Sequence, residues 1–287
     1  MKKTVLQISV LLTAALGLAG CDYVKDARNP DTAPVVGNRK VLIEDYTGHK
    51  CGNCPAAADT LSYIKNKYPG KIIPVAIHAG FFATAAPSTS YPTDFRNPVS
   101  DAYDTQFGIS LAGNPNGLVN RGNYGTGNFV KAYTTWEGDA YQMLSTPAKF
   151  ELKIRNTFNA TGNSLNTSVT VKSLGYNTGM YKLVVLLTED SIVAEQLDYR
   201  LPSGSQLIPN YEFEHVLRDA INSTWGDAVF ASGAIPNDSV VKSYNNYTIS
   251  SNYRARKCHV VAYIYDANSS SPTYYEVLQA EEEKVTH

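Results

Sequence analysis

A C-x-x-C motif at Cys51-Gly52-Asn53-Cys54 lies between a predicted strand and a predicted helix, and it constrains the fold more than any other feature. Residues 40–46 are largely apolar and predict a strand, whereas residues 55–68 carry apolar side chains at helical spacing. Residues 72–77 predict a second buried strand. The segment therefore predicts a βαβ unit with the two cysteines where the first strand meets the helix.

This position suits thiol chemistry. Unpaired backbone N–H groups and the helix dipole stabilise a thiolate at a helix N-terminus. Cys51 is expected to be the exposed attacking thiol, and Cys54 the shielded thiol that resolves a mixed disulfide. His49 and Lys50 lie just upstream and either could add positive charge near Cys51, or both could belong to a solvated loop.

The strand Val41–Tyr46 followed by this motif resembles the active-site strand and loop of the thioredoxin superfamily. The resemblance implies a buried acid six residues before the first cysteine, which is Asp45, and a role for it in proton transfer with Cys54. Glu44 would point to the opposite face of the strand. A surface carboxylate at a strand end is the alternative for Asp45.

The same family places a cis-proline opposite the cysteines, and Pro115 matches it in order and context. It would help to hold an extended substrate beside the sulfur atoms; the alternative is an ordinary turn proline. Lys50 departs from the family, because an aromatic residue usually precedes the first cysteine.

The N-terminus predicts export. Two lysines precede an apolar run that is too short for a comfortable membrane span, and residues 1–20 are interpreted as a signal peptide. Leu18-Ala19-Gly20-Cys21 resembles the lipobox of bacterial lipoproteins, which implies a lipid on Cys21; an ordinary signal peptide with a chance cysteine is the alternative. Residues 21–38 are expected to be the lipidated N-terminus and a tether.

The rest of the chain predicts an α/β part followed by an all-β part. We expect a thioredoxin-like domain over 39–147, with an insertion at about 79–100 and helices over 99–107 and 129–145. From residue 148 the apolar period changes to two, which predicts an antiparallel β-sandwich over 148–287. An insertion at about 189–250 is expected to contain a short helix over 212–221.

A closer resemblance covers most of the mature chain. Residues 47–55, 114–121 and 215–218 are similar to the 28-kDa outer-membrane protein family of Bacteroidetes. That similarity implies an outer-membrane lipoprotein with a thioredoxin-like domain followed by a β-sandwich. Some members of the family are discussed as adhesins or receptors, so fold alone does not decide the function.

The remaining candidate groups predict little chemistry. Cys258 lies in an apolar alternation and is expected to be a buried structural thiol. The five histidines are scattered, which argues against zinc, and no metal or other cofactor is predicted. His215 and Arg218 would share a helix face, where they could form a local polar network or a binding spot. The net charge of −1 gives no electrostatic basis for binding nucleic acid.

Two functions follow from these observations. The first is a thiol–disulfide oxidoreductase acting on protein or peptide thiols and disulfides of the cell envelope, on the periplasmic or the surface face of the outer membrane, and held there by the lipid on Cys21. The second is a surface-binding or adhesion protein in which Cys51–Cys54 is a static disulfide and the β-sandwich makes the contacts. The direction of electron flow and the oligomeric state stay open.

Overall fold

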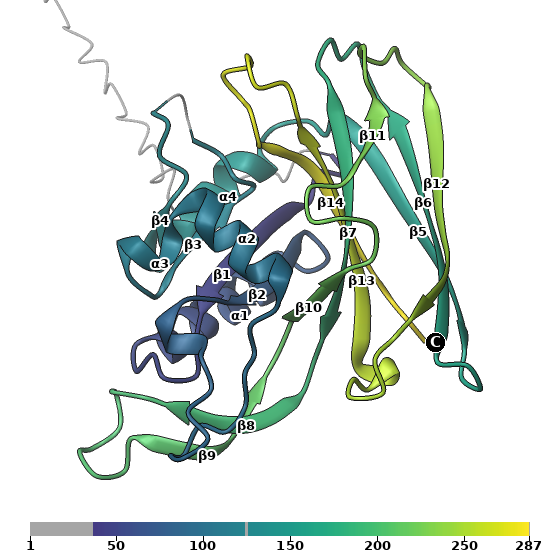
Figure 1. Cartoon of the computed structure of the whole chain (residues 1–287). Helices are drawn as coiled ribbons and strands as arrows, with labels where there is room; N and C mark the ends of the chain where they lie inside the picture. Colours follow the sequence, from purple (N-terminus) through teal and green to yellow (C-terminus); the bar gives the residue numbers. More distant parts are fainter. Residues whose placement is uncertain (1–36, 124–125, 287) are drawn as a thin grey trace, which may run out of the picture. The chain divides into compact units, whose positions relative to one another are not determined.

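The computed structural model describes residues 37–123 and 126–286 (Figure 1). The predicted signal peptide, Cys21 and nearly all of the predicted tether lie outside the described residues. The elements in chain order are β1 (Val41–Thr47), α1 (Cys54–Lys67), β2 (Ile72–His78), η2 (Phe81–Ala83), α2 (Pro98–Phe107), α3 (Ile109–Ala112), β3 (Asn116–Val119), β4 (Lys131–Ala132), η3 (Tyr133–Thr135), α4 (Trp136–Leu144), β5 (Phe150–Asn159), β6 (Ser164–Ser173), β7 (Tyr181–Glu189), β8 (Ile192–Leu197), β9 (Leu207–Phe213), β10 (Val216–Ala220), β11 (Asp227–Phe230), β12 (Ser239–Thr248), η4 (Ala255–Lys257), β13 (Cys258–Asp266) and β14 (Val277–Lys284).

The predicted βαβ unit is confirmed. β1 and β2 are parallel neighbours joined through α1, and both are buried along their whole length. β3 pairs antiparallel with β1, and the short β4 follows at the edge. Helices α1 and α4 pack on one face of these strands through Ile64 and Trp136, among other apolar residues.

The large sheet continues beyond this unit into the second half of the chain. Its order is β14-β13-β7-β10-β2-β1-β3-β4, so strands from both sides of the boundary predicted at residues 147 and 148 belong to one sheet. One apolar cluster contains residues from both halves, among them Leu42, Tyr46, Leu186 and Val261. The two halves of the chain therefore share one large sheet and one apolar core.

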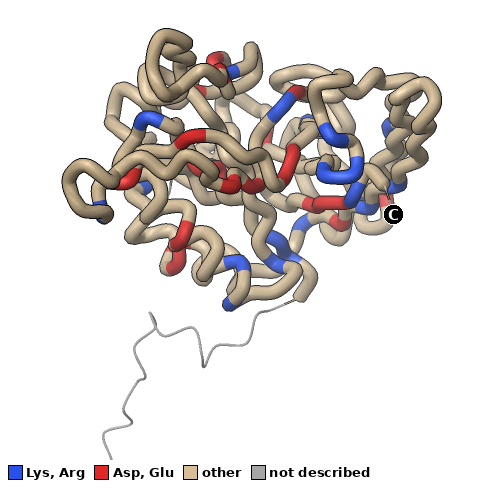
Figure 2. The backbone as a smooth tube through the Cα atoms, turned by 90° about the horizontal axis from the view of Figure 1, so that it is seen from below, with Lys and Arg blue, Asp and Glu red and all other residues tan. Residues whose placement is uncertain are grey.

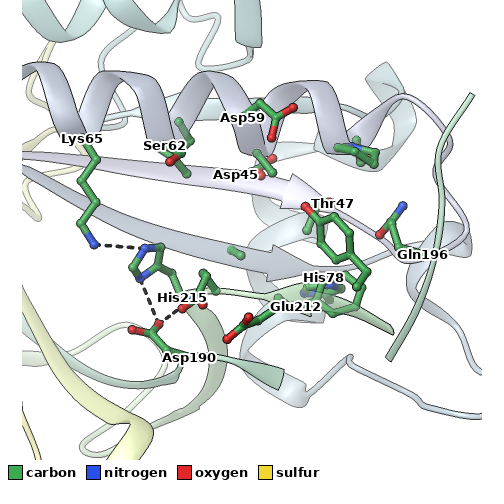
Figure 3. Close-up of a pocket in the computed structure, with 18 of the residues that line it drawn as sticks. Asp45, Thr47, Asp59, Ser62, Lys65, His78, Asp190, Gln196, Glu212 and His215 are labelled. Carbon is green, nitrogen blue, oxygen red and sulfur yellow. Dashed lines mark hydrogen bonds and ion pairs between the residues drawn. The ribbon is translucent and has the colours of Figure 1, made fainter. Parts of the chain in front are cut away.

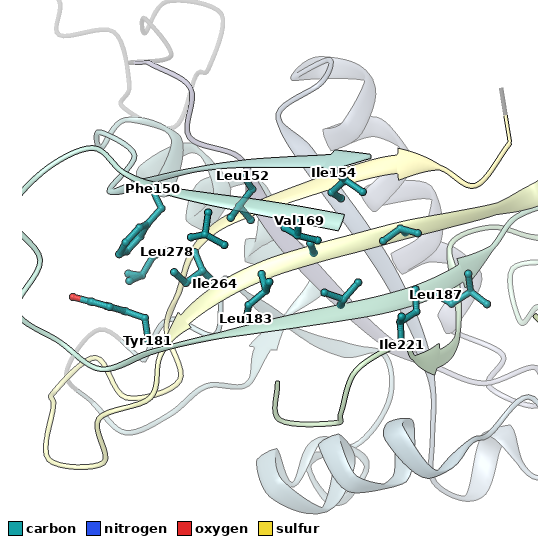
Figure 4. Close-up of a cluster of buried hydrophobic side chains, with 14 of the residues drawn as sticks. Phe150, Leu152, Ile154, Val169, Tyr181, Leu183, Leu187, Ile221, Ile264 and Leu278 are labelled. Atoms are coloured by element: carbon teal, nitrogen blue, oxygen red, sulfur yellow. The ribbon is translucent and has the colours of Figure 1, made fainter. Parts of the chain in front are cut away.

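A second, three-stranded sheet of order β12-β6-β5 packs on the far half of the large sheet. Phe150, Leu152 and Val169 face Leu183 and Ile264 across the interface (Figure 4). The period-two alternation predicted for this region is confirmed, because inward residues of β6 are buried and their neighbours are less so. The molecule is therefore mixed α/β with a large content of sheet.

The segment 189–250, predicted as an insertion with a short helix, supplies strands β8 to β12, and β10 and β11 belong to the large sheet. The short helix predicted over 212–221 is wrong: this stretch contains the end of β9 and all of β10, with His215 at a φ of 58° between them. β8 and β9 form a separate hairpin, and β10 joins β2 to β7. Burial of Val216 and Leu217 in the sheet outweighs a spacing that is compatible with a helix.

Two helices predicted in the first half have different outcomes. The helix predicted over 99–107 is confirmed as α2, which starts at Pro98 after an Asn97 capping box. The helix predicted over 129–145 begins too early, because Lys131–Ala132 pairs with β3 and α4 starts only at Trp136.

Candidate functional site

Cys51 and Cys54 form a disulfide where β1 leads into α1. The α-helix begins at Cys54, and Pro55 follows in the first turn, where a missing N–H leaves no hydrogen bond unmade. The backbone N–H of Cys54 donates to the carbonyl of Cys51 at 3.1 Å, which closes the loop. The local geometry is that predicted from the sequence.

The prediction that Cys51 is exposed is wrong. Its exposed fraction is 3%, and that of Cys54 is 1%. The C-x-x-C loop is covered on one side by the chain after β2, where the N–H of Lys50 donates to the carbonyl of Phe82 at 3.0 Å. It is covered on another side by the β8–β9 hairpin, whose Tyr199 N–H donates to the carbonyl of Gly52 at 2.8 Å.

Asp45 is a buried acid on β1 with an exposed fraction of 2%. Its Oδ1 atom has no hydrogen-bond partner among the described residues. Burial raises the pKa of this carboxyl from 3.8 to about 7. Asp45 can therefore exchange a proton near neutral pH, which an ordinary surface carboxylate does not do.

Glu44 points to the opposite face of β1, as the strand period predicted. The Arg121 guanidinium donates to its two carboxylate oxygens at 2.7 and 2.6 Å, and both side chains are buried. Arg121 also donates to the Tyr263 hydroxyl at 2.8 Å and lies over the rings of Tyr103 and Phe107. This network joins β1 to β13 and lies apart from the cysteines.

His49 and Lys50 do not both bring charge to the cysteines. Burial, with a contribution from the charge of Lys50, lowers the pKa of His49 to about 4, so its ring is neutral at pH 7. That ring stacks on Tyr91 with 5.3 Å between centroids. The Lys50 ammonium donates to Thr84 at 2.5 Å and lies 4.6 Å from the centre of the Phe81 ring, toward the covering chain.

The Asn114–Pro115 peptide bond is cis. Pro115 directly precedes β3, whose first residue Asn116 pairs with Tyr46 near the end of β1. Because the C-x-x-C loop starts from that same end of β1, the register places Pro115 on the edge of the sheet from which the loop leaves.

A cavity of about 400 Å³ lies between α1, the ends of β1 and β2, and the β9–β10 segment (Figure 3). Cys54, Asp45 and His78 line one part of it. Lys65 and His215 lie in another part, where the Lys65 ammonium is 3.1 Å from Nε2 of His215 (Figure 3). The buried acid and the shielded cysteine therefore border the same cavity.

A polar network lies at the far part of the cavity, and the partners of His215 and Arg218 in it were not predicted. His215 Nδ1 lies 3.1 Å from Asp190, whose other oxygen is 3.5 Å from Nδ1 of His259. Arg218, predicted to share a face with His215, pairs instead with Glu189 at 2.9 Å. The sequence carried no signal for these contacts, because they join β10 to strands distant in the chain.

Other candidate groups carry little chemistry. Cys258 is buried and unbonded, and burial raises the pKa of its thiol to about 12, in agreement with a structural role. Among the residues that the structure describes, no cluster of three or more potential metal ligands is found. No helix in that part of the chain is long and apolar enough to cross a membrane. Acidic and basic residues are interleaved along the backbone (Figure 2).

Comparison with known proteins places the chain among proteins of the outer membrane. The family model described as Outer membrane protein Omp28 matches residues 100–287, a range that includes Pro115 and Arg121 and begins after the C-x-x-C motif. A comparison with curated proteins finds no match.

Two solved structures are similar in fold. HBP35 of Porphyromonas gingivalis has a TM-score of 0.56 and 14% identity, over 86% of this chain and 75% of that one. Protein AGR_C_4864 from Agrobacterium tumefaciens has a TM-score of 0.53 and 14% identity, over 87% of this chain and 96% of that one. At such identities the likeness concerns the fold alone.

Proposed function

The chain belongs to the Omp28 family of outer membrane proteins, and from that premise we propose that it is a lipid-anchored thiol–disulfide oxidoreductase of the outer membrane that uses Cys51 and Cys54. Lipid on Cys21 would hold it at the membrane, so its partners are thiols or disulfides of proteins and peptides in the cell envelope. The proposal does not specify whether the protein lies on the periplasmic or the surface face of the outer membrane.

The observation that carries the proposal is Asp45. A buried carboxyl with an oxygen that lacks a hydrogen bond costs folding free energy, and a static disulfide does not require one. Asp45 and Cys54 line the same cavity, and the pKa of Asp45 is about 7. A proton donor and acceptor with this pKa suits thiol chemistry at neutral pH.

The proposed reaction transfers two electrons and two protons. The Cys51 thiolate attacks a partner disulfide, and one partner sulfur leaves with the bonding electron pair and takes up a proton. Cys54, whose proton passes to Asp45, then attacks the Cys51 sulfur of the mixed disulfide. The second partner sulfur leaves and is protonated, so the partner is reduced and the Cys51–Cys54 disulfide is formed. The reverse sequence oxidises a partner dithiol.

The arrangement around β1 supports a thioredoxin-like assignment for this half of the molecule. A βαβ unit carries the C-x-x-C motif, β3 is antiparallel to β1, and Pro115 directly precedes β3 at the edge of the sheet from which the C-x-x-C loop leaves. Backbone groups beside Pro115 could orient an extended substrate near the sulfur atoms.

The second candidate is a binding or adhesion protein with a static disulfide. The observation that favours it is the burial of Cys51, because an attacking sulfur needs access. In this reading the sheets of the second half carry the partner contacts and the C-x-x-C loop only fastens β1 to α1.

One experiment separates the two candidates: reduction of a disulfide substrate such as insulin by the reduced protein, together with the reduction potential of the pair. We expect turnover that is abolished by Cys51→Ser and unchanged by Cys258→Ser, since Cys258 is buried away from the loop. No turnover, together with a disulfide that resists glutathione, would establish the static reading.

A further inference from the structure

The β8–β9 hairpin covers the C-x-x-C loop and belongs to no larger sheet. Its two strands pair only with each other, and the hairpin projects from the body of the molecule beside the start of α1 (Figure 1). The exposed fraction of Val193 on β8 is 58% and that of Leu207 on β9 is 38%. A two-stranded hairpin of this kind is marginally stable by itself, so its position depends on what it contacts.

Backbone contacts join the end of β8 and the turn that follows it to the C-x-x-C loop. The N–H of Leu197 donates to the carbonyl of His49 at 2.9 Å, and the N–H of Tyr199 donates to the carbonyl of Gly52 at 2.8 Å. The Gln196 side chain donates to the carbonyl of Cys51 at 3.0 Å. The hairpin thus supplies two backbone donors, two residues apart, to the carbonyls on both sides of the attacking cysteine.

The Tyr199 ring lies directly on Gly52. A Cβ atom on Gly52 would be 2.4 Å from Cγ of Tyr199, so only glycine in this position leaves room for the ring. Tyr199 as a whole is 56% exposed, although its ring lies against Gly52.

An exposed ion pair fastens the turn of the hairpin to α1. The Arg200 guanidinium lies 2.6 Å from the Asp59 carboxylate, and the two side chains are 48% and 68% exposed. Exposed pairs of this kind contribute little free energy and are weakened further by salt. The contact can therefore be released without unfolding the sheet.

We propose that residues 196–200 are an internal occupant of a polypeptide-binding site on the C-x-x-C loop, displaced when a partner segment binds. The inference rests on the proposed oxidoreductase function and names its substrate class: a polypeptide segment whose N–H groups replace those of Leu197 and Tyr199 at the carbonyls of His49 and Gly52. The hairpin also protects the disulfide from small thiols while no partner is bound.

Protection by the hairpin is measured as the second-order rate constant for reduction of Cys51–Cys54 by dithiothreitol, followed by alkylation and mass analysis. Because reaction requires the open state, its rate scales with the open fraction, and the double variant Gln196→Ala/Tyr199→Ala is expected to react about tenfold faster than the natural protein. Tyr63→Ala is the matched control, because Tyr63 is 51% exposed on α1 and makes no contact with the loop among the interactions described. It is expected to leave the rate unchanged.

Each outcome decides one proposal. A faster reduction in the double variant but not in the control supports the hairpin as a lid, whether or not insulin is turned over. Absence of turnover then rejects the oxidoreductase function and the substrate class that rests on it, and leaves the lid. Equal rates in all three proteins overturn the lid, and turnover by the natural protein would still support the function. If the double variant has lost its far-UV circular dichroism, Arg200→Gln gives the same test, with an increase of about threefold expected.

Discussion

The two faces of β1 hold neighbouring buried acids in opposite surroundings. Glu44 accepts two short hydrogen bonds from Arg121 in a network that includes Tyr263. Asp45, the next residue, borders a cavity and has an oxygen with no hydrogen-bond partner among the described residues. One face of β1 thus holds a buried ion pair, and the other holds a carboxyl that can titrate. We expect the face with the ion pair to stabilise the fold, and the face with the unpaired acid to take part in the chemistry.

The largest effect is expected on the paired face. Replacing Arg121 by Met leaves Glu44 buried without its cation, which should lower the free energy of unfolding by about 3–5 kcal/mol. Urea denaturation at pH 7 measures it. Arg96→Met, which breaks the partly exposed pair with Asp94, should cost about 1 kcal/mol or less.

A double variant sharpens this prediction. Adding Glu44→Gln to Arg121→Met removes the buried negative charge that Arg121 no longer neutralises, so much of the lost stability should return. The stability changes of the two single variants should therefore be strongly non-additive. Additive losses would show that Arg121 acts through packing against Tyr103 and Phe107 and not through its charge.

Replacing the unpaired acid Asp45 should raise the stability of the protein, whereas replacing Arg121 should lower it. The pKa of Asp45 is 3.8 in an unfolded chain and about 7 in the folded protein, so the folded state binds more protons between these values. Stability should therefore fall as the pH rises from about 4 to 8, by roughly 4 kcal/mol at most. Asp45→Asn should remove this loss and be more stable than the natural protein at pH 8.

The same variant tests the proposed chemistry. Without a proton acceptor beside Cys54, insulin reduction should fall on the order of a hundredfold, although the protein is more stable. Asp101→Asn, an exposed acid in the first turn of α2, is the control and should leave turnover unchanged and lower the stability by about 1 kcal/mol or less. If Asp45→Asn is instead less stable, the Asp45 carboxylate makes a stabilising interaction, and Asp45 and Glu44 do not differ in being unpaired and paired.

Local sequence predicted much of this strand but not its partners. Apolar runs and helical spacing located β1, α1 and β2 to within a residue or so, and the strand period placed Glu44 and Asp45 on opposite faces. Arg121 comes from 77 residues away, at a φ of 50° that no apolar pattern encodes. Periodicity reports that a residue is buried, but it does not report which distant residue faces it.

The covering hairpin escaped prediction for the same reason. Gln196 reaches the carbonyl of Cys51 across 145 residues of chain, and the alternation in β8 is too weak to reveal this contact. The close approach of the Tyr199 ring gives Gly52 a physical role, but a glycine inside a C-x-x-C motif is equally compatible with an open loop. Exposure of Cys51 was consequently overestimated.

The smallest expected effect concerns His78, which shares the cavity face with Asp45 through its pairing with Thr47. Both ring nitrogens lack hydrogen bonds among the described residues, and the ring packs on Phe95 and Phe213. Burial lowers the pKa of His78 from 6.5 to about 3.

Since the unfolded chain takes up this proton below pH 6.5 and the folded protein does not, His78 should reduce stability as the pH falls. His78→Phe keeps a ring among the aromatic neighbours and removes the titration, so it should be more stable than the natural protein by about 2 kcal/mol at pH 5. At pH 7 the histidine is largely neutral in both states, and the difference there measures packing alone. If the variant and the natural protein differ in stability by the same amount at pH 5 and pH 7, His78 is solvated or paired. Asp45 would then be the unpaired group of the two on the cavity face of the sheet.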